Sequence, residues 1–328
     1  MSDKIHVVFA VYDPRGTFSC HAGVAMYSIF SNTKSPVCVH ILHDDTLCKD
    51  NMEKFIELTE KFGQETNFID VSEYIGKFPV DVEKLTRRYS RGSLFRLFIQ
   101  DLLPVDKVIY LDCDVLVELD IRELWDVNLG DCEIGAVLDA RNVRKGRTGF
   151  ICRYTGIEPD KYFNSGVIVF DLIKIRGKNI NIWAEALEYF RRYPYALSPD
   201  QDFLNKIFNK SMCELDRKFN TFGFAIDFSS VKGKLWHAKP WDPARISPNV
   251  VIYWRYLAMT PWSHDIVVDI TEAWAKSQYT HHNSSHCIKR LLRGLKRKLS
   301  PRSVWLSYKI IVIWHDVIYR IRKKLNNK

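Results

Sequence analysis

Two aspartates in one short segment, Asp112 and Asp114, are the residues whose types and spacing most clearly allow chemistry. They lie inside the Val/Ile/Leu-rich run 108–117, which is typical of a strand buried on both faces in a parallel sheet. In an extended chain such side chains project to the same side, so both carboxylates can converge on one cation. Carboxylate oxygens suit hard divalent ions such as Mg²⁺ or Mn²⁺, which usually also hold substrate phosphates. The alternative is a strand that ends in a solvated acidic turn.

The elements around this pair alternate between strand and helix. Strands are predicted at 5–11, 36–43, 67–71, 133–138 and 162–171. Helices are predicted over 17–31, 49–62, 89–103, 182–193 and 201–208. This alternation predicts an α/β fold whose mixed, mostly parallel sheet is flanked by helices. Open sheets of this kind bind ligands at the carboxyl ends of their strands.

The basic excess of the chain is concentrated at its carboxyl end. The net charge is +9, and residues 287–328 hold 13 of the 48 Lys and Arg residues but only one of the 39 acids. Apolar residues at 288, 291, 292, 295 and 299 form one stripe of a helix in this segment. Basic amphipathic helices with interfacial Trp and Tyr bind anionic membranes. We therefore predict a catalytic domain over 1–280 and membrane-associating helices over 281–328; a solvated or partner-binding helix hairpin is the alternative, and no nucleic-acid partner is expected.

The cysteine pattern bears on the compartment. The eight cysteines are scattered and form no C-x-x-C pair, as expected for reduced thiols in a cytosolic protein. The amino terminus offers no secretory signal, and no apolar run approaches the roughly 18–20 residues that span a bilayer. We expect a cytoplasmic protein that is peripheral on the inner face of the cell membrane.

A series of short segments occurs in a recognisable order. They lie at 8–10, 93–97, 110–114, 136–139, 162–167, 199–205 and 237–241. Over residues 5 to about 245 the chain resembles glycosyltransferase family 8, the retaining GT-A group that includes bacterial lipooligosaccharide galactosyl- and glucosyltransferases and glycogenin. The resemblance implies a GT-A fold and Mn²⁺-dependent transfer (Mg²⁺ being possible) of a hexose from UDP-galactose or UDP-glucose. The expected acceptor is a glycan or glycolipid, such as a lipopolysaccharide or lipooligosaccharide core.

The resemblance also implies how the diphosphate is held. Asp112 and Asp114 would chelate the metal, His237 would be its third ligand, and Lys239 would place a cation on the diphosphate. Similar proteins have a glycine and further residues between this histidine and the Lys-Pro-Trp segment, whereas this sequence has only Ala238. The alternatives are a buried structural imidazole and a surface lysine.

Further residues align with the donor-binding region of the family. They are Ala10, Tyr12, Asp13, Arg96, Cys113, Asp139, Asn164 and Ser165. Asp13 matches the segment that contacts uracil and ribose, and simple turn chemistry explains it equally well. The family often has an aspartate at the position of Tyr12. Arg96 lies within an otherwise apolar helix, so we expect it to pair with a carboxylate of the site.

Asp200 and Gln201 are the predicted catalytic residues. In the family, the aspartate holds sugar hydroxyls and the glutamine lies under the anomeric carbon. Retention ordinarily needs a carboxylate nucleophile. An amide is a poor nucleophile, so front-face attack within an oxocarbenium-like ion pair is the alternative. A helix N-cap with a polar first turn also accounts for these two residues.

Two other classes of function stay open. The compact segment 237–239 permits an inactive relative that acts as a binding or scaffold protein. A nucleotidyltransferase would also use paired aspartates. That reading calls for a Gly-rich phosphate loop near the amino terminus, where residues 13–16 contain one glycine.

Overall fold

The computed structural model describes residues 4–78, 81–86, 90–139, 149–193, 198–223, 225–238 and 247–263. Lys239 and the predicted membrane-associating segment 281–328 lie outside the described residues. No helix in the described ranges combines the length and the apolar character that a membrane crossing requires.

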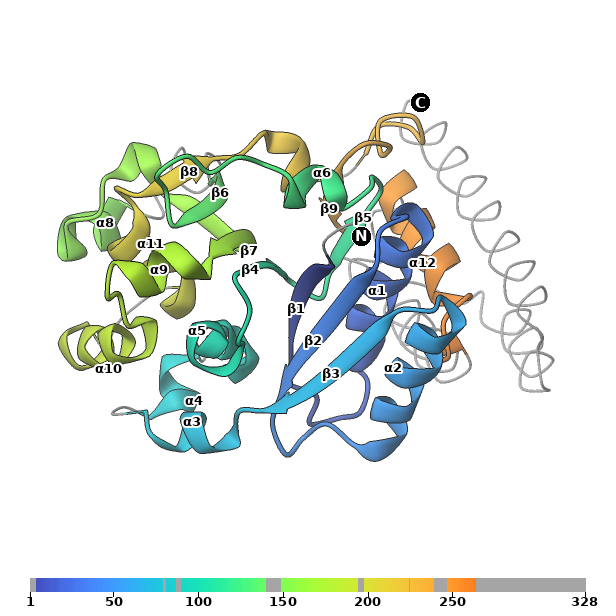
Figure 1. Cartoon of the computed structure of the whole chain (residues 1–328), viewed down its shortest axis with the longest axis horizontal. Coiled ribbons are helices and arrows are strands. Elements are labelled where there is room, and N and C mark those ends of the chain that lie inside the picture. Colours follow the sequence, from blue (N-terminus) through green and yellow to red (C-terminus); the bar gives the residue numbers. More distant parts are fainter. Residues whose placement is uncertain are drawn as a thin grey trace, which may run out of the picture.

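A seven-stranded sheet forms the centre of the fold, in the order β3-β2-β1-β4-β7-β6-β8 (Figure 1). Its strands are β1 (Ile5–Val11), β2 (Val37–His43), β3 (Glu65–Asp70), β4 (Lys107–Leu111), β6 (Ile134–Leu138), β7 (Phe163–Asp171) and β8 (Met212–Glu214). Strand β7 runs antiparallel to both of its neighbours, and the other four pairings are parallel. The predicted mixed, mostly parallel sheet is therefore confirmed.

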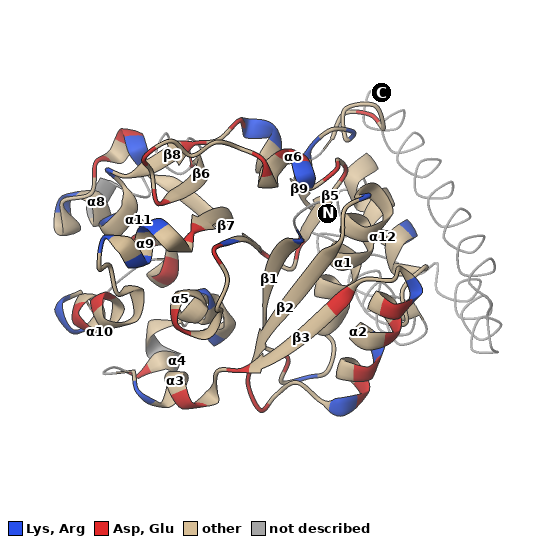
Figure 2. Ribbon diagram, in the orientation of Figure 1, with Lys and Arg blue, Asp and Glu red and all other residues tan. Residues whose placement is uncertain are grey.

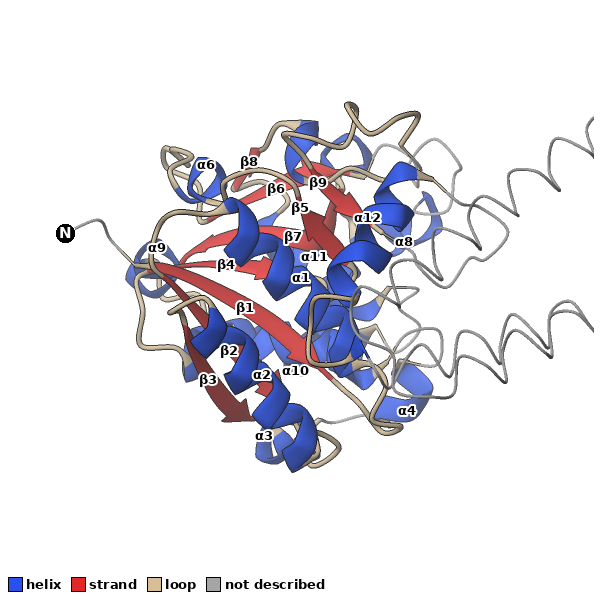
Figure 3. Cartoon of the chain, turned by 90° about the vertical axis from the view of Figure 1, so that its right-hand side faces the viewer, coloured by secondary structure: helices blue, strands red, loops and turns tan. Residues whose placement is uncertain are grey.

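Helices cover both faces of this sheet. One face carries α1 (Ser19–Asn32), α2 (Lys49–Lys61) and α12 (Pro248–Leu257), which are turned toward the viewer in Figure 3. The other face carries the 3₁₀ helix η1 (Arg91–Phe98), α5 (Ile99–Leu102), α10 (Ile182–Arg192) and α11 (Pro199–Phe208). The shorter helices are α3 (Ser72–Gly76), α4 (Val82–Leu85), η2 (Pro159–Lys161), α6 (Arg122–Trp125), α8 (Gly149–Thr155), α9 (Leu172–Gly177) and η3 (Arg217–Phe219).

The alternation of side chains along β1 explains the two-layered core. Val7 and Phe9 point into the core beneath α1, whereas Val8 and Ala10 point into the core beneath η1. Neither β1 nor β2 contains a Lys, Arg, Asp or Glu residue, and the charged residues lie instead on elements such as α2 (Figure 2). Strands apolar on both faces are what a sheet covered on both sides requires.

Two predicted elements differ from the structure. The run 108–117 is not one strand, because β4 ends at Leu111 and the chain then turns. The next strand, β5 (Val115–Val117), pairs with β9 (Leu235–His237) in a separate two-stranded sheet. The segment 89–103 is mainly a 3₁₀ helix, which winds more tightly than the predicted α-helix.

Candidate active site

The candidate site lies where β4 ends and β7 begins. Because β7 is antiparallel to β4, its amino end lies at the same edge of the sheet as the carboxyl end of β4. The backbone N–H of Asp112 donates to the carbonyl oxygen of Gly166, at 2.7 Å. The residues just before and at the start of β7 therefore face the paired aspartates directly.

Asp112, Asp114 and His237 come together at this edge. Each offers one ligand atom, and these atoms all lie within 4.8 Å of one another. His237 reaches the aspartates through the pairing of β5 with β9, in which it lies opposite Val115. Its Nδ1 is 3.0 Å from Oδ1 of Asp114. The structure thus gathers the three predicted metal residues despite the short connection after His237.

Gly166 leaves space between two of these ligands. A Cβ atom added there would lie 2.6 Å from Oδ2 of Asp112 and 2.8 Å from Cε1 of His237. Both distances are shorter than atoms tolerate, so only glycine keeps this cradle open. Two carboxylates and one imidazole form a donor set that suits a hard divalent ion such as Mn²⁺ or Mg²⁺. The residues present therefore fit a divalent metal.

Arg96 is buried behind the aspartates and is paired, as predicted. Its Nη2 donates to Oδ1 of Asp112 at 2.9 Å, and its Nη1 lies 3.3 Å from Oδ2 of Asp200. Nη1 also donates to the backbone oxygen of Ser165 at 2.6 Å, and the guanidinium stacks over the Tyr110 ring at 4.2 Å. Fixing Oδ1 of Asp112 in this way turns its other oxygen toward Gly166.

The carboxylate of Asp200 is held beside this cation. Ser165 Oγ donates to its Oδ2 at 2.9 Å. Burial raises the pKa of Asp200 above its ordinary value, and the charge of Arg96 opposes that rise. Asp200 is therefore a buried acidic group whose ionised form depends on Arg96.

A relay of side-chain amides crosses the site. Nε2 of Gln201 donates to Oδ2 of Asp139 at 3.3 Å, and Nδ2 of Asn164 donates to Oε1 of Gln201 at 3.0 Å. Nδ2 of Asn220 donates to Oδ1 of Asn164 at 2.9 Å, and Oδ1 of Asn220 lies 2.8 Å from Nε2 of His237. The relay joins predicted donor-binding residues to the three potential metal ligands.

The direction of the relay follows from its fixed partners. An ionised carboxylate such as that of Asp139 only accepts hydrogen bonds, and the backbone N–H groups of Ser165 and Gly166 donate to Gln201 and Asn164. Asn220 therefore presents its oxygen to His237. In a neutral His237 that donates from Nε2 to Asn220, the lone pair of Nδ1 would be available to a metal ion shared with Asp114. Stacking on the Phe222 ring, with centroids 4.3 Å apart, supports this orientation.

Two predicted donor-binding residues near the amino terminus, Asp13 and Tyr12, contact other parts of the protein in the structure. The buried carboxylate of Asp13 accepts hydrogen bonds from the backbone N–H groups of Phe18 and Ser19, at 2.7 and 2.9 Å, and from Asn51 at 3.1 Å. It thus holds the start of α1, as turn chemistry alone would predict, and its contact with a donor stays a prediction. Tyr12 lies against the guanidinium of Arg91, 4.7 Å from the ring centroid.

Cys113 and Ala10 are both buried. The thiol of Cys113 lies 3.3 Å from the backbone oxygen of Ala10 and donates to it, which links β1 to the turn after β4. Asn220 and Phe222 were not predicted, because they follow η3 in a loop whose sequence carries no motif. Backbone hydrogen bonds between β9 and Thr221 bring His237 to them: His237 N–H donates to the Thr221 oxygen, and Thr221 N–H donates to the Leu235 oxygen.

The comparisons with known proteins agree with this geometry. The family model "Glycosyl transferase family 8" matches residues 10–264. General stress protein A of Bacillus subtilis is 25% identical, over 85% of this chain and 93% of the relative. Lipopolysaccharide 1,3-galactosyltransferase of Salmonella typhimurium is 22% identical, over 91% and 92% of the two chains. The solved structure of the galactosyltransferase LgtC with donor and acceptor sugar analogues superposes with a TM-score of 0.65, at 24% identity, over 78% of this chain and 96% of LgtC.

The sheet order and the site at its edge define a protein with a GT-A-like fold. Since the family model covers most of the chain, the protein belongs to glycosyl transferase family 8. Membership makes it a transferase, and the family takes a nucleotide-sugar donor and a glycan acceptor.

Proposed function

We propose that this protein transfers galactose or glucose from a UDP-sugar to a saccharide acceptor, with retention of configuration. Mn²⁺ would be held by Asp112, Asp114 and His237. The observation that carries the proposal is the cradle at Gly166, where a Cβ would collide with ligands from two different sheets. A position that admits no side chain beside Asp112 and His237 lets these two groups approach each other, which supports a shared ion.

The metal, when bound, would neutralise negative charge that develops on the departing diphosphate. Arg96 would keep one oxygen of Asp112 occupied, so that the other is directed at the ion. The relay that ends at Asn220 would keep the lone pair of His237 pointing the same way. We also propose that Lys239 contacts the diphosphate, and only the family resemblance supports this role.

Asp200 and Gln201 would act on the donor sugar. Asp200, oriented by Arg96 and Ser165, would accept hydrogen bonds from sugar hydroxyls. The oxygen of Gln201 already accepts from Nδ2 of Asn164 and from the backbone N–H of Ser165. These bonds withdraw electron density from an oxygen that is a weak nucleophile, which favours front-face attack through an ion pair over a covalent intermediate.

The acceptor is the finer part of the proposal. The name of the Salmonella typhimurium relative supports a lipopolysaccharide or lipooligosaccharide core. The 13 basic residues within 287–328 support contact with the anionic inner face of a membrane, next to a catalytic domain over 1–280. The acceptor is thus proposed from the name of a relative, and the membrane contact from charge and composition.

Calorimetric titration of UDP, with Mn²⁺ and with EDTA, tests the donor site in the wild type and in Asp114→Asn. We expect binding that requires Mn²⁺ and is lost in the variant. Hydrolysis of UDP-galactose and UDP-glucose on the same samples then identifies the donor. Absence of UDP binding by folded wild-type protein would reject the proposal and favour the inactive relative.

A further inference from the structure

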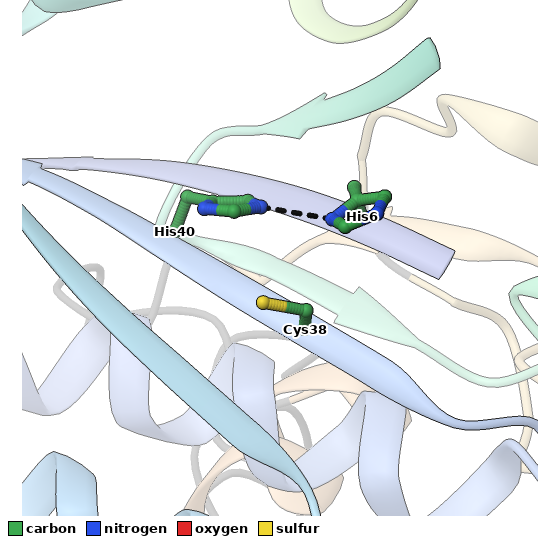
Figure 4. A group of neighbouring side chains, drawn as sticks. All are labelled: His6, Cys38 and His40. Atoms are coloured by element: carbon green, nitrogen blue, oxygen red, sulfur yellow. Dashed lines mark hydrogen bonds between the residues drawn. The ribbon is translucent and has the colours of Figure 1, made fainter. Parts of the chain in front are cut away.

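A second group of potential metal ligands lies at the other end of the same strands. His6 on β1 and Cys38 and His40 on β2 point to one face of the sheet, where they lie close together (Figure 4). One ligand atom from each lies within 4.8 Å of the others. The register pairs Val8 with Tyr110, and continuing it by two residues places Ala10 level with Asp112, so His6 is about 13 Å from the active-site edge along the strand. The two groups are therefore separate.

The geometry of the two rings is close to that of a metal site. Nδ1 of His6 and Nε2 of His40 form a hydrogen bond at 3.0 Å, which an ion bound between the two nitrogens would replace. A tetrahedral Zn²⁺ ion holds two imidazole nitrogens about 3.3 Å apart. The thiol is the more distant group, and side-chain movements of about 1 Å would bring it to bonding distance.

The surroundings favour ligation in three ways. Nδ2 of Asn67 donates to the sulfur of Cys38 at 3.2 Å, which is the kind of outer contact that stabilises a metal-bound thiolate. Nδ1 of His40 is buried and has no hydrogen-bond partner among the described residues. Such atoms are uncommon, and a water molecule would serve as the outer partner of this nitrogen while Nε2 ligates the ion.

The third feature is a pocket of about 380 Å³ that opens onto all three side chains. The segment Leu102 to Val105, which leads from α5 into β4, forms the apolar side of this pocket. The pocket gives an ion a path to the ligands and room for a water molecule in the fourth position. Glu65, on the rim, is bonded to Lys4 at 2.6 Å, so the two charges compensate each other.

We propose that His6, Cys38 and His40 form a binding site for a borderline-soft divalent transition-metal ion, with Zn²⁺ as its probe. Two imidazoles and a thiolate select such ions over Mg²⁺ and Mn²⁺. The ion would tie β1 to β2 at their amino ends. Binding forms a Zn–S bond and breaks the S–H bond of Cys38, and the proton leaves to solvent.

The protonation states set the pH dependence of this site. Burial, followed by the effect of Glu65, raises the pKa of the Cys38 thiol to about 11, so binding at neutral pH releases about one proton. Burial, followed by the effect of His6, lowers the pKa of His40 to about 4, and burial, followed by the charge of Lys4, lowers the pKa of His6; both rings are therefore neutral near pH 7 and can ligate. Affinity for Zn²⁺ should therefore rise with pH.

The test needs a background without other ligands for soft metals. Residues 281–287 contain three histidines and a cysteine, so the full-length chain would carry His281→Ala, His282→Ala, His286→Ala and Cys287→Ser. Asp114→Asn removes the active-site cluster as well. Zn²⁺ is titrated calorimetrically, and Co²⁺ is added to a second sample, because a thiolate-to-cobalt charge-transfer band arises only when sulfur ligates.

We expect one Zn²⁺ per chain and a charge-transfer band in this background. Cys38→Ser should abolish the band, and His6→Gln, at a half-buried position, should weaken Zn²⁺ binding at least tenfold. Cys213→Ser, on β8, is the matched control and should change neither. Metal-free thermal unfolding shows that each variant is folded. Absence of Zn²⁺ binding in the folded background, or an unchanged band in Cys38→Ser, would overturn the proposal.

Discussion

Nε2 of His237 lies 2.8 Å from Oδ1 of Asn220, and Asn220 is bound in turn to Asn164. A residue outside every recognisable motif therefore holds the ring nitrogen of the predicted metal ligand that points away from Asp114. Removing the hydrogen-bond partner of a metal-ligating histidine typically lowers the metal affinity 10–100-fold.

Asn220→Ala should weaken Mn²⁺ binding by about 10–100-fold, measured by titration of the free-ion electron paramagnetic resonance signal. Asn220→Asp keeps an oxygen opposite Nε2 of His237 and should retain most of the affinity. Equal binding by the wild type and Asn220→Ala would show that the relay does not orient His237.

Gly166→Ala should abolish measurable Mn²⁺ binding, because the new Cβ would displace Asp112 or His237. Gly177→Ala is the control, since a Cβ at that position meets no atom within 4 Å. Both variants are compared by Mn²⁺ titration and circular dichroism. A folded Gly166→Ala protein with wild-type affinity would rule out an ion in this cradle.

Arg96→Met should lower the free energy of unfolding by about 3–5 kcal/mol, because it leaves Asp112 and Asp200 without their buried cation. Urea denaturation measures the loss. Arg191→Met removes an exposed ion pair with Glu188 and should change stability by less than about 1 kcal/mol. Similar values for the two variants would contradict the role assigned to Arg96.

His40 should make stability depend on pH. Burial lowers its pKa in the folded state to about 4, whereas the unfolded chain has the ordinary value of 6.5. Between these values the unfolded state binds more protons, so stability falls as the pH falls from 6.5 to 4, by roughly 3 kcal/mol. The slope should flatten in His40→Gln, and an unchanged slope would assign the effect to other groups.

Deletion of residues 287–328 should release the protein from vesicles that contain anionic lipid, because 13 basic residues are removed. Hydrolysis of the UDP-sugar donor in solution should persist. Vesicle sedimentation and the hydrolysis assay are run on the same preparations. Loss of vesicle binding and of hydrolysis together would show that the segment belongs to the catalytic fold.

Local patterns predicted most of the elements well. The strand at 5–11 and the helix over 182–193 match β1 and α10 closely. Strand β1 is an almost continuous buried run, and α10 buries one periodic apolar face. The run 108–117 misled the prediction, because an apolar stretch does not reveal that its second half pairs with another sheet. The change from β4 to β5 depends on β9, which is more than a hundred residues away.

The site was predictable only where its residues lie in motifs. Asp112, Asp114 and His237 were named from the sequence, and the structure brings them together. Asn220 and the steric role of Gly166 depend on long-range pairing, which leaves no local signal. Asp13 was also named from the sequence as a donor-binding residue, but in the structure its carboxylate accepts hydrogen bonds from the start of α1.

The passage of the chain between two sheets within the turn Asp112–Asp114 has an evolutionary consequence. Inserting or deleting one residue there would shift β5 by one position against β9 and exchange its two buried faces. The packing of the core alone therefore constrains the length of this turn. A lineage that abandoned catalysis would be free to replace the two carboxylates, yet it would still inherit a segment of unchanged length.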